Sequence, residues 1–148
     1  MSNYAYNKKA KFDYEILKTI EAGLVLAGPE VKSIRNHGIK LSGAFVGFIG
    51  DEVFLKNLHI PKYKYDGRKY EYEPERERKL LLNKKEIAYL KGKSQEKGLT
   101  IIPISIYNRG RNIKIEIAIA RGKKKYDKRE TIKKRELKRE LDRKMKEF

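Results

Sequence analysis

The amino-acid sequence predicts a mainly β protein: a closed, antiparallel, oligonucleotide-binding-like (OB-like) β-barrel with peripheral α-helices and a basic C-terminal tail. Three observations lead to this fold class. Between residues 14 and 119, short segments repeat the apolar–polar alternation of half-buried strands, and glycine-containing turns separate them. Roughly six or seven short strands with two inserted helices fit a small closed barrel, because closure hides the edges of the sheet. The last residues, 122–148, contain few apolar side chains.

The first predicted strand leads into a short helix. Residues 14–20 alternate in the strand pattern, and residues 22–27 continue it around the strand breaker Gly23. The Gly-Pro-Glu sequence at 28–30 then ends the strand. Because proline suits the first helical position, it predicts a helix over residues 30–36.

Two hairpins are predicted from turn chemistry. Residues 45–49 and 52–55 flank a two-residue Gly-Asp turn with glycine in the first position. Residues 101–107 and 113–119 face each other across a turn that contains Gly110, and the second of these segments alternates strictly. The second hairpin therefore has the clearest strand pattern in the sequence.

A second helix and a long loop lie between these hairpins. Residues 83–90 predict a helix, because Asn83 suits the N-cap and Gly98 follows the helical pattern. The preceding segment, 62–78, alternates tyrosine with charged residues and contains a proline. It is expected to be an exposed loop or an irregular sheet edge.

The charge balance indicates a polyanionic partner. The chain has 37 Lys and Arg against 20 Asp and Glu, a formal net charge of +17. Nucleic acid is the leading partner class, with an anionic membrane surface second. The membrane reading is the weaker one, because no segment has the ~18 apolar residues needed to span a bilayer. We expect a cytoplasmic protein, since the sequence contains no cysteine and no signal-peptide pattern.

The chain is predicted to divide into a β-barrel domain that binds RNA, residues 1–121, and a basic tail, residues 122–148. In the tail, Leu137, Leu141 and Met145 form a stripe too narrow to stabilise an isolated helix. We expect the tail to be disordered alone and to fold as a helix on its partner. The alternative is a helix that is simply solvated.

No pattern in the sequence indicates catalysis. His37 and His59 lack companions at metal-ligand spacing, and they are interpreted as structural residues. Glu21, Glu30 and Glu52 are scattered among the strands. The sequence therefore predicts a protein that is not an enzyme and needs no metal or cofactor. A nuclease remains the alternative, because carboxylates distant in sequence can meet in the fold.

The signal for nucleic-acid binding is richer. Basic residues cluster at 8–11, 76–79 and 109–111, and tyrosines alternate with lysines at 62–65. Aromatic rings can stack on bases while cations contact phosphates. The same alternation is also typical of an exposed edge strand, so both interpretations stay open.

Six short motifs follow one another along the chain. They are Asn7-Lys8-Lys9-Ala10, Asp13-Tyr14-Glu15-Ile16, Glu21-Ala22-Gly23, Glu30-Val31-Lys32-Ser33-Ile34-Arg35, Arg76-x-Arg78-Lys79-Leu80-Leu81-Leu82-Asn83 and Gly122-Lys123-Lys124-x-Tyr126-Asp127-Lys128-Arg129. Together, and in this order, they resemble the small protein B (SmpB) family, the tmRNA-binding proteins of bacterial trans-translation. The resemblance covers about residues 7–135.

This resemblance implies a barrel that holds the tRNA-like domain of tmRNA at the elbow where its D and T loops meet. Elongation factor Tu would deliver the alanine-charged complex to ribosomes stalled on messages without a stop codon. The tail would then lie in the empty mRNA channel near the decoding centre. The implied function is that of an adaptor in ribosome rescue and peptide tagging.

The resemblance also assigns site residues. The tmRNA-binding positions it implies are Asn7, Lys8, Glu21, Lys32, Arg35, Leu81, Asn83 and Lys114. Lysine and arginine suit phosphates, and asparagine suits base edges or 2′-hydroxyls. Glu21 is expected to accept from a base amine, to hold a neighbouring cation or to be structural. Leu81 is expected to pack either on a base or in the core.

The implied ribosome-binding residues all lie in the tail. They are Gly122, Lys123, Lys124, Tyr126, Asp127, Lys128 and Arg129. The ring of Tyr126 is expected to stack on a base of the decoding centre. A generic oligonucleotide- or ribosomal-RNA-binding module is the alternative function, and it would bind any tRNA with a steep salt dependence.

Overall fold

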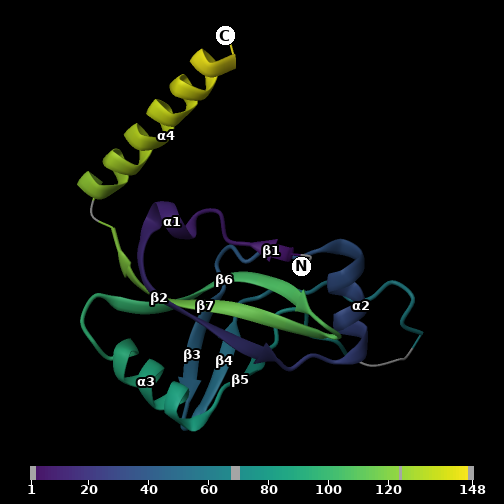
Figure 1. The fold of residues 1–148 in the computed structure, drawn as a ribbon. Coiled ribbons are helices and arrows are strands. Elements are labelled where there is room, and N and C mark those ends of the chain that lie inside the picture. The colour runs from purple at the N-terminus through teal and green to yellow at the C-terminus, as the bar shows by residue number, and fades with distance from the viewer. Residues whose placement is uncertain (1–2, 68–70, 124, 147–148) are drawn as a thin grey trace.

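The computed structural model describes residues 3–67, 71–123 and 125–146. Its centre is one antiparallel sheet of seven strands in the order β1-β6-β7-β2-β5-β4-β3, surrounded by helices (Figure 1). The strands are β1 (Asn3–Tyr6), β2 (Tyr14–Leu24), β3 (Phe45–Ile49), β4 (Glu52–Lys56), β5 (Arg78–Leu81), β6 (Leu99–Arg109) and β7 (Asn112–Gly122). The helices are α1 (Ala10–Asp13), α2 (Gly28–His37), α3 (Lys84–Ser94) and α4 (Lys125–Lys146).

The hairpin of β6 and β7 and the long strand β2 form the middle of the sheet. Ile106 of β6 lies opposite Ile115 of β7, and Ile115 lies opposite Ala22 of β2. This isoleucine-rich face contributes a large part of the main core, and its burial favours folding because it removes apolar surface from water. On the other face, Ile102 and Ile104 pack with Ala10 of α1 in a second, smaller cluster. The hairpin predicted over residues 101–107 and 113–119 is confirmed, and both strands are longer than expected.

The first predicted hairpin is confirmed as β3 and β4. Gly50 occupies the first turn position with φ 60°, a conformation that L-residues with side chains rarely adopt. Strand β4 continues the sheet through β5 to β2. Strands β1 and β5 and helix α1 are additions to the sequence prediction.

The predicted closure of the barrel is not confirmed. The strand order is linear, with β1 and β3 at its ends, and within the described residues no ladder joins these two strands. Strand β3 approaches β6, so the sheet curls back on itself (Figure 1). Strand β1, however, pairs with β6 at Ser105, Ile106 and Tyr107, and it occupies that part of the edge. The structure is therefore a curled, open sheet.

Both helices predicted within the body are confirmed. Helix α2 starts at the Gly-Pro step and buries Glu30, Ser33 and Ile34 against the body. Helix α3 begins after Asn83, whose Oδ1 accepts a hydrogen bond from the Glu86 N–H at 2.8 Å. Local capping signals therefore placed both helix starts.

Helix α4 extends away from the sheet (Figure 1). Lys123 links it to α1, because its backbone N–H donates to the Asp13 carbonyl and its Nζ donates to the Lys11 carbonyl. The Arg135 guanidinium lies 5.8 Å from the centre of the Phe12 ring. The domain boundary at residue 121 and the disorder of the free tail stay predictions. None of the described helices is long and apolar enough to cross a membrane.

Candidate RNA-binding surface

Three of the predicted RNA-binding residues surround one hollow of about 360 Å³. Arg35 comes from α2, Leu81 from the end of β5, and Lys114 from β7. Arg111 and Asn112, at the tip of the central hairpin, line the same hollow. Residues separated by about half the chain are thus assembled at one end of the sheet. We call this site the cationic hollow.

Strand register explains why these side chains meet. Gly23 of β2 pairs with Lys114 on one side and with Leu81 on the other, so all three lie on one face of the sheet. A Cβ at Gly23 would lie 3.1 Å from the Leu81 Cβ. The close approach of the two strands favours glycine here, and its missing side chain leaves space in the hollow.

The cationic hollow combines positive charge with an exposed apolar group. Arg35, Arg111 and Lys114 line it, and none of the described lining residues is acidic. The Arg35 Nη2 donates to the Arg111 carbonyl at 3.4 Å, which ties α2 to the hairpin tip. Leu81 is 57% exposed, whereas Leu80 is buried in the core. Of the two interpretations of Leu81, the core leucine is therefore wrong.

Glu21 holds a neighbouring cation. Its Oε2 accepts hydrogen bonds from the Tyr107 hydroxyl and from the Arg109 Nη1, the latter at 2.7 Å. These two hydrogen bonds lower the pKa of Glu21, with the tyrosine as the larger cause. Burial, followed by the Glu21 hydrogen bond, raises the pKa of Tyr107. Glu21 therefore positions Arg109 near the hairpin tip.

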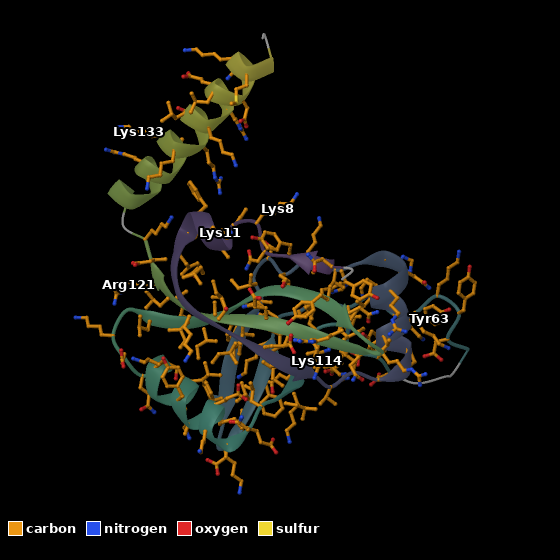
Figure 2. All side chains as sticks on the ribbon, in the orientation of Figure 1. Lys8, Lys11, Tyr63, Lys114, Arg121 and Lys133 are labelled. Atoms are coloured by element: carbon orange, nitrogen blue, oxygen red, sulfur yellow. The ribbon has the colours of Figure 1, made fainter. Side chains whose placement is uncertain are left out.

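The two asparagines predicted to contact RNA, Asn7 and Asn83, have structural partners within the protein. Asn7 donates from its backbone N–H to the Ile104 carbonyl at 2.7 Å and from Nδ2 to the Pro103 carbonyl at 3.0 Å. Asn83 caps α3. Lys8 is exposed beside α1 (Figure 2). None of these residues lines the cationic hollow.

Lys32 lies one helical turn before Arg35 but faces a different hollow. Its Nζ lies 5.6 Å from the centre of the Tyr63 ring. The tyrosine-rich segment therefore packs beside α2, and its residues up to Gly67 contain no strand. The exposed-loop prediction for this segment is confirmed over residues 62–67 and 71–77. It is wrong at Arg78, which begins strand β5 and is buried.

The predicted ribosome-binding residues begin where the sheet ends. Gly122 pairs with Tyr14 at the end of β7, and Lys123 contacts α1 as described above. Arg129 is exposed on α4. Lys124 lies outside the described residues, as do the side chains of Tyr126, Asp127 and Lys128, although the backbone of these last three belongs to α4.

The three carboxylates scattered among the strands, Glu21, Glu30 and Glu52, each pair with a different cation. Glu21 pairs with Arg109, and Glu52 pairs with Lys79 at 3.2 Å. Glu30 pairs with Arg78 in the body. Among the described residues no cluster of three or more His, Asp or Glu side chains could hold a metal ion.

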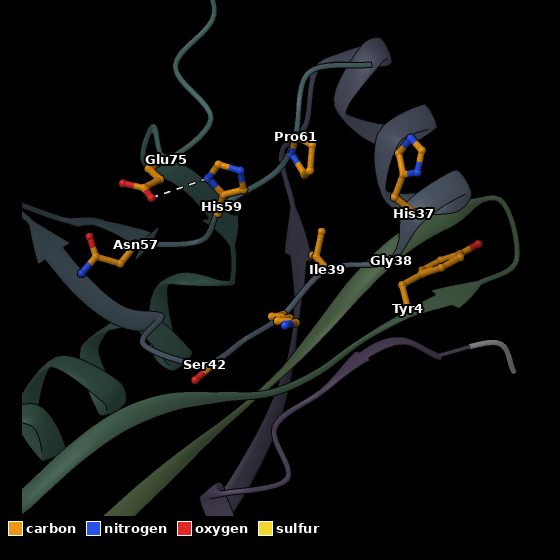
Figure 3. A pocket seen from close by; sticks show the side chains of 10 residues that line it. Tyr4, His37, Gly38, Ile39, Ser42, Asn57, His59, Pro61 and Glu75 are labelled. Carbon is orange, nitrogen blue, oxygen red and sulfur yellow. Dashed lines mark ion pairs between the residues drawn. The ribbon is translucent and has the colours of Figure 1, made fainter. Parts of the chain in front are cut away.

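The two histidines share a hollow of about 620 Å³ (Figure 3). His59 Nδ1 lies 3.5 Å from the Glu75 Oε1, and Figure 3 shows His37 on the far side of Pro61. In the sequence each histidine lacks a companion at metal-ligand spacing, and the fold brings the two to one hollow. No described metal cluster includes them.

Sequence reasoning missed Gly23, Arg111 and Asn112 as parts of the site. The basic cluster at 109–111 was visible in the sequence, but its place beside Arg35 depends on the register of β7 with β2. Gly23 was interpreted only as a strand breaker. In each case the sequence lacked one piece of information, namely which residues of neighbouring strands lie opposite each other.

Comparison with known proteins gives one consistent result. The SmpB protein family model matches residues 4–147. An SsrA-binding protein from Thermosipho melanesiensis is 55% identical over 143 residues, covering 95% of this chain and 96% of the relative. An SsrA-binding protein from Chloroflexus aurantiacus is 48% identical over 142 residues, covering 96% and 89%.

A solved structure is also similar. It comes from a study of tmRNA–SmpB and the centre of the bacterial ribosome, and the matched chain has a TM-score of 0.67 and 45% sequence identity. The match covers 81% of this chain and 84% of the other. The order of the short sequence motifs, the antiparallel sheet and these matches all indicate the same family. The chain belongs to the SmpB protein family.

Proposed function

We propose that this protein binds the tRNA-like domain of tmRNA (SsrA RNA) and brings it to stalled ribosomes for trans-translation. The observation that carries the proposal is the cationic hollow, found in a chain whose relatives are SsrA-binding proteins. Arg35, Arg111 and Lys114 would neutralise phosphates around it. Leu81 would pack on a base or ribose that the RNA elbow presents.

The shape of the hollow favours folded RNA over any polyanion. A patch of solvated lysines neutralises phosphates in any arrangement. The cationic hollow instead holds its cations in place around an exposed leucine. Arg109 lies outside the hollow but pairs with Asn112, which lines it, and Glu21 holds the Arg109 guanidinium. Cations fixed in this way favour one arrangement of phosphates, because other arrangements leave them unpaired.

The tail is proposed to act on the ribosome. Helix α4 would lie in the empty mRNA channel, with the 122–129 segment near the decoding centre. Elongation factor Tu would take part indirectly, by binding the charged tmRNA. On this proposal the protein works in the cytoplasm as an adaptor, and its RNA partner carries the alanine.

The test is a titration of the full-length protein with the tRNA-like half of tmRNA, with alanine tRNA as competitor, at two salt concentrations. We expect Arg35→Ala/Lys114→Ala to weaken binding by about 10- to 100-fold. The slope of the logarithm of affinity against the logarithm of salt concentration (the salt slope) should become shallower, by the amount expected for the loss of about two phosphate contacts. The control is Lys85→Ala/Lys97→Ala, which removes the same charge from exposed positions outside the hollow.

Two outcomes would contradict the proposal. Equal binding to tmRNA and alanine tRNA that vanishes as salt rises would indicate a generic RNA-binding module. Magnesium-dependent cleavage of the RNA would indicate a nuclease.

A further inference from the structure

We propose that a second hollow, between α2 and the tyrosine-rich segment, binds an unstacked nucleotide of the RNA partner. The hollow has a volume of about 340 Å³ and is lined by Gly28, Pro29, Lys32, Tyr63, Tyr65 and Asp66. We call it the tyrosine hollow. The inference rests on the proposed function, and it adds a base-stacking contact to the phosphate contacts of the cationic hollow.

The two tyrosines provide a surface for a base. Their ring centres are 5.6 Å apart, with 68° between the ring planes, so they form a corner. Tyr65 is 73% exposed, which leaves most of its ring open to water. A base stacked on Tyr65 with its edge against Tyr63 would bury this surface. Stacking suits any base, because every base has a π-face.

Cations lie beside both rings. The Lys32 Nζ is 5.6 Å from the centre of the Tyr63 ring, and the Lys64 Nζ is 5.7 Å from the centre of the Tyr65 ring. A nucleotide presents a flat base and an anionic phosphate a short distance apart, and this arrangement matches both features. Asp66 lines the same hollow and would repel a phosphate. The phosphate is therefore assigned to the Lys32 side of the hollow.

The residues before the hollow anchor the segment to α2. The Ser33 hydroxyl of α2 donates to the Pro61 carbonyl at 2.6 Å, directly before the tyrosines. Tyr72 donates from its hydroxyl to the Ile60 carbonyl at 2.8 Å, and the Ile60 N–H donates to the Pro74 carbonyl at 2.9 Å. The two ends of the segment are thus held together.

A buried ion pair holds the far end of the segment on the same helix. The Arg78 Nη2 lies 2.6 Å from the Glu30 Oε2, and the Arg76 guanidinium also pairs with Glu30. Because Glu30 and Ser33 both belong to α2, both ends of the tyrosine-rich segment are tied to this helix. The hollow is therefore formed before the RNA arrives, and preorganisation lowers the free energy lost on binding.

Helix α2 connects the two hollows. Lys32 lines the tyrosine hollow and Arg35 lines the cationic hollow. Residues three apart on a helix are neighbours, with about 5–6 Å between their Cβ atoms. Figure 2 places Tyr63 beside α2. One RNA strand can therefore contact Arg35 with one phosphate and Lys32 with another, and place the adjoining base on the tyrosines.

The experiment compares substitutions at the tyrosines in the full-length protein, by titration with the tRNA-like half of tmRNA. We expect Tyr65→Ala and Tyr63→Ala each to weaken binding by about 5- to 100-fold, because stacking is the interaction lost. Tyr65→Phe keeps the ring and should bind like the wild type. Tyr65→Leu keeps apolar volume without a flat ring and should bind like Tyr65→Ala. The salt slope should stay unchanged in all four variants, since no phosphate contact is removed.

The matched control is Tyr89→Ala. Tyr89 is an exposed tyrosine of α3 that also has lysines over its ring, Lys18 at 4.7 Å and Lys93 at 5.8 Å, but it lines neither hollow. Its loss should leave the affinity within about twofold of the wild type, because no base is stacked there. As a direct readout, ultraviolet cross-linking followed by mass spectrometry should join Tyr65 to one nucleotide of the RNA.

The outcomes separate this inference from the proposed function. If both tyrosine-to-alanine variants bind normally while Arg35→Ala/Lys114→Ala binds weakly, the tyrosine hollow is not an RNA site and the cationic hollow stands. If neither set changes the affinity, the proposed function itself is wrong. If Tyr65→Leu binds as well as the wild type, stacking is overturned.

Discussion

The sheet body and helix α4 are both strongly basic, but they hold their charges in opposite ways. In the body, cations are held by partners from other elements, as Arg109 is by Glu21 and Arg35 by the Arg111 carbonyl. In α4 the described side chains from Ile132 to Met145 are all exposed. The body therefore presents charge in a defined shape, whereas α4 presents it along a rod with a rise of about 1.5 Å per residue.

This difference suggests a division of labour. A shaped site suits one folded RNA, and a charged rod suits a channel whose walls are anionic along their length. Arg135 of α4 contacts Phe12 of the body, and exposed cation–π pairs contribute only about 0.5–1 kcal/mol. This division of labour can be tested by removing one region and measuring the function of the other.

The largest expected effect is the separation of RNA binding from peptide tagging. Deleting residues 122–148 should leave the affinity for the tRNA-like half of tmRNA within a fewfold of the wild type, because both hollows lie in the body. Tagging of a nascent peptide on a message without a stop codon should be abolished. The measurements are a binding titration and an in vitro tagging reaction. Loss of tmRNA binding in the truncated protein would show that the body and tail do not act separately.

The next effect concerns the fixed charges of the body. Glu30 and Arg78 are 1% and 0% exposed, and Glu30→Gln would leave the arginine buried without a counter-ion. The free energy of unfolding should fall by about 3–5 kcal/mol, measured by denaturant titration. The control, Glu52→Gln, breaks the exposed pair with Lys79 and should change stability by about 0–1 kcal/mol. Equal effects of the two substitutions would mean that burial does not distinguish these pairs.

The same pair predicts a pH dependence of stability. Burial alone would raise the pKa of Glu30, but hydrogen bonds from the Ala27 N–H, Arg78 and Arg76 outweigh it and lower the pKa below the ordinary value of 4.5. A carboxyl group with a lowered folded-state pKa contributes stability that is present above 4.5. That contribution is lost as the pH falls through the folded pKa, and it should be missing from the acid denaturation curve of Glu30→Gln.

The smallest effect tests the space inside the cationic hollow. Gly23→Ala places a methyl group 3.1 Å from the Leu81 Cβ, which is fixed to the backbone, so the two strands must move slightly apart. We expect a destabilisation of about 1–3 kcal/mol and weaker binding of the tRNA-like domain, measured by thermal unfolding and titration. Gly92→Ala in α3 meets nothing within 4 Å and should stabilise the protein by about 0.5–1 kcal/mol. Unchanged RNA binding by Gly23→Ala would mean that RNA does not use the hollow.

Local signals in the sequence determined much of the fold. The Gly-Asp turn at 50–51 set the hairpin of β3 and β4, and Asn83 set the start of α3. Strict alternation over 113–119 identified β7. Each of these features depends on residues close together in the sequence, so they could be predicted without the structure.

Short elements could not be predicted in this way. Strand β5 has four residues, with Arg78 buried by its pairing with Glu30 of α2. An arginine at a core position contradicts the alternation of a strand until its distant partner is known. Closure of the barrel was also predicted from strand number, but β1 occupies part of the edge of β6 and the sheet stays open.

The sequence alone determined the charge, the strand and helix pattern of the body and the resemblance to the SmpB family. Only the tertiary structure decided which cations stand together. Lys114, Gly23 and Leu81 became neighbours through the register of β7, β2 and β5, and α2 brought Lys32 to Tyr63. The physical reason is that register and helix docking are set by packing between distant segments, which no local pattern records.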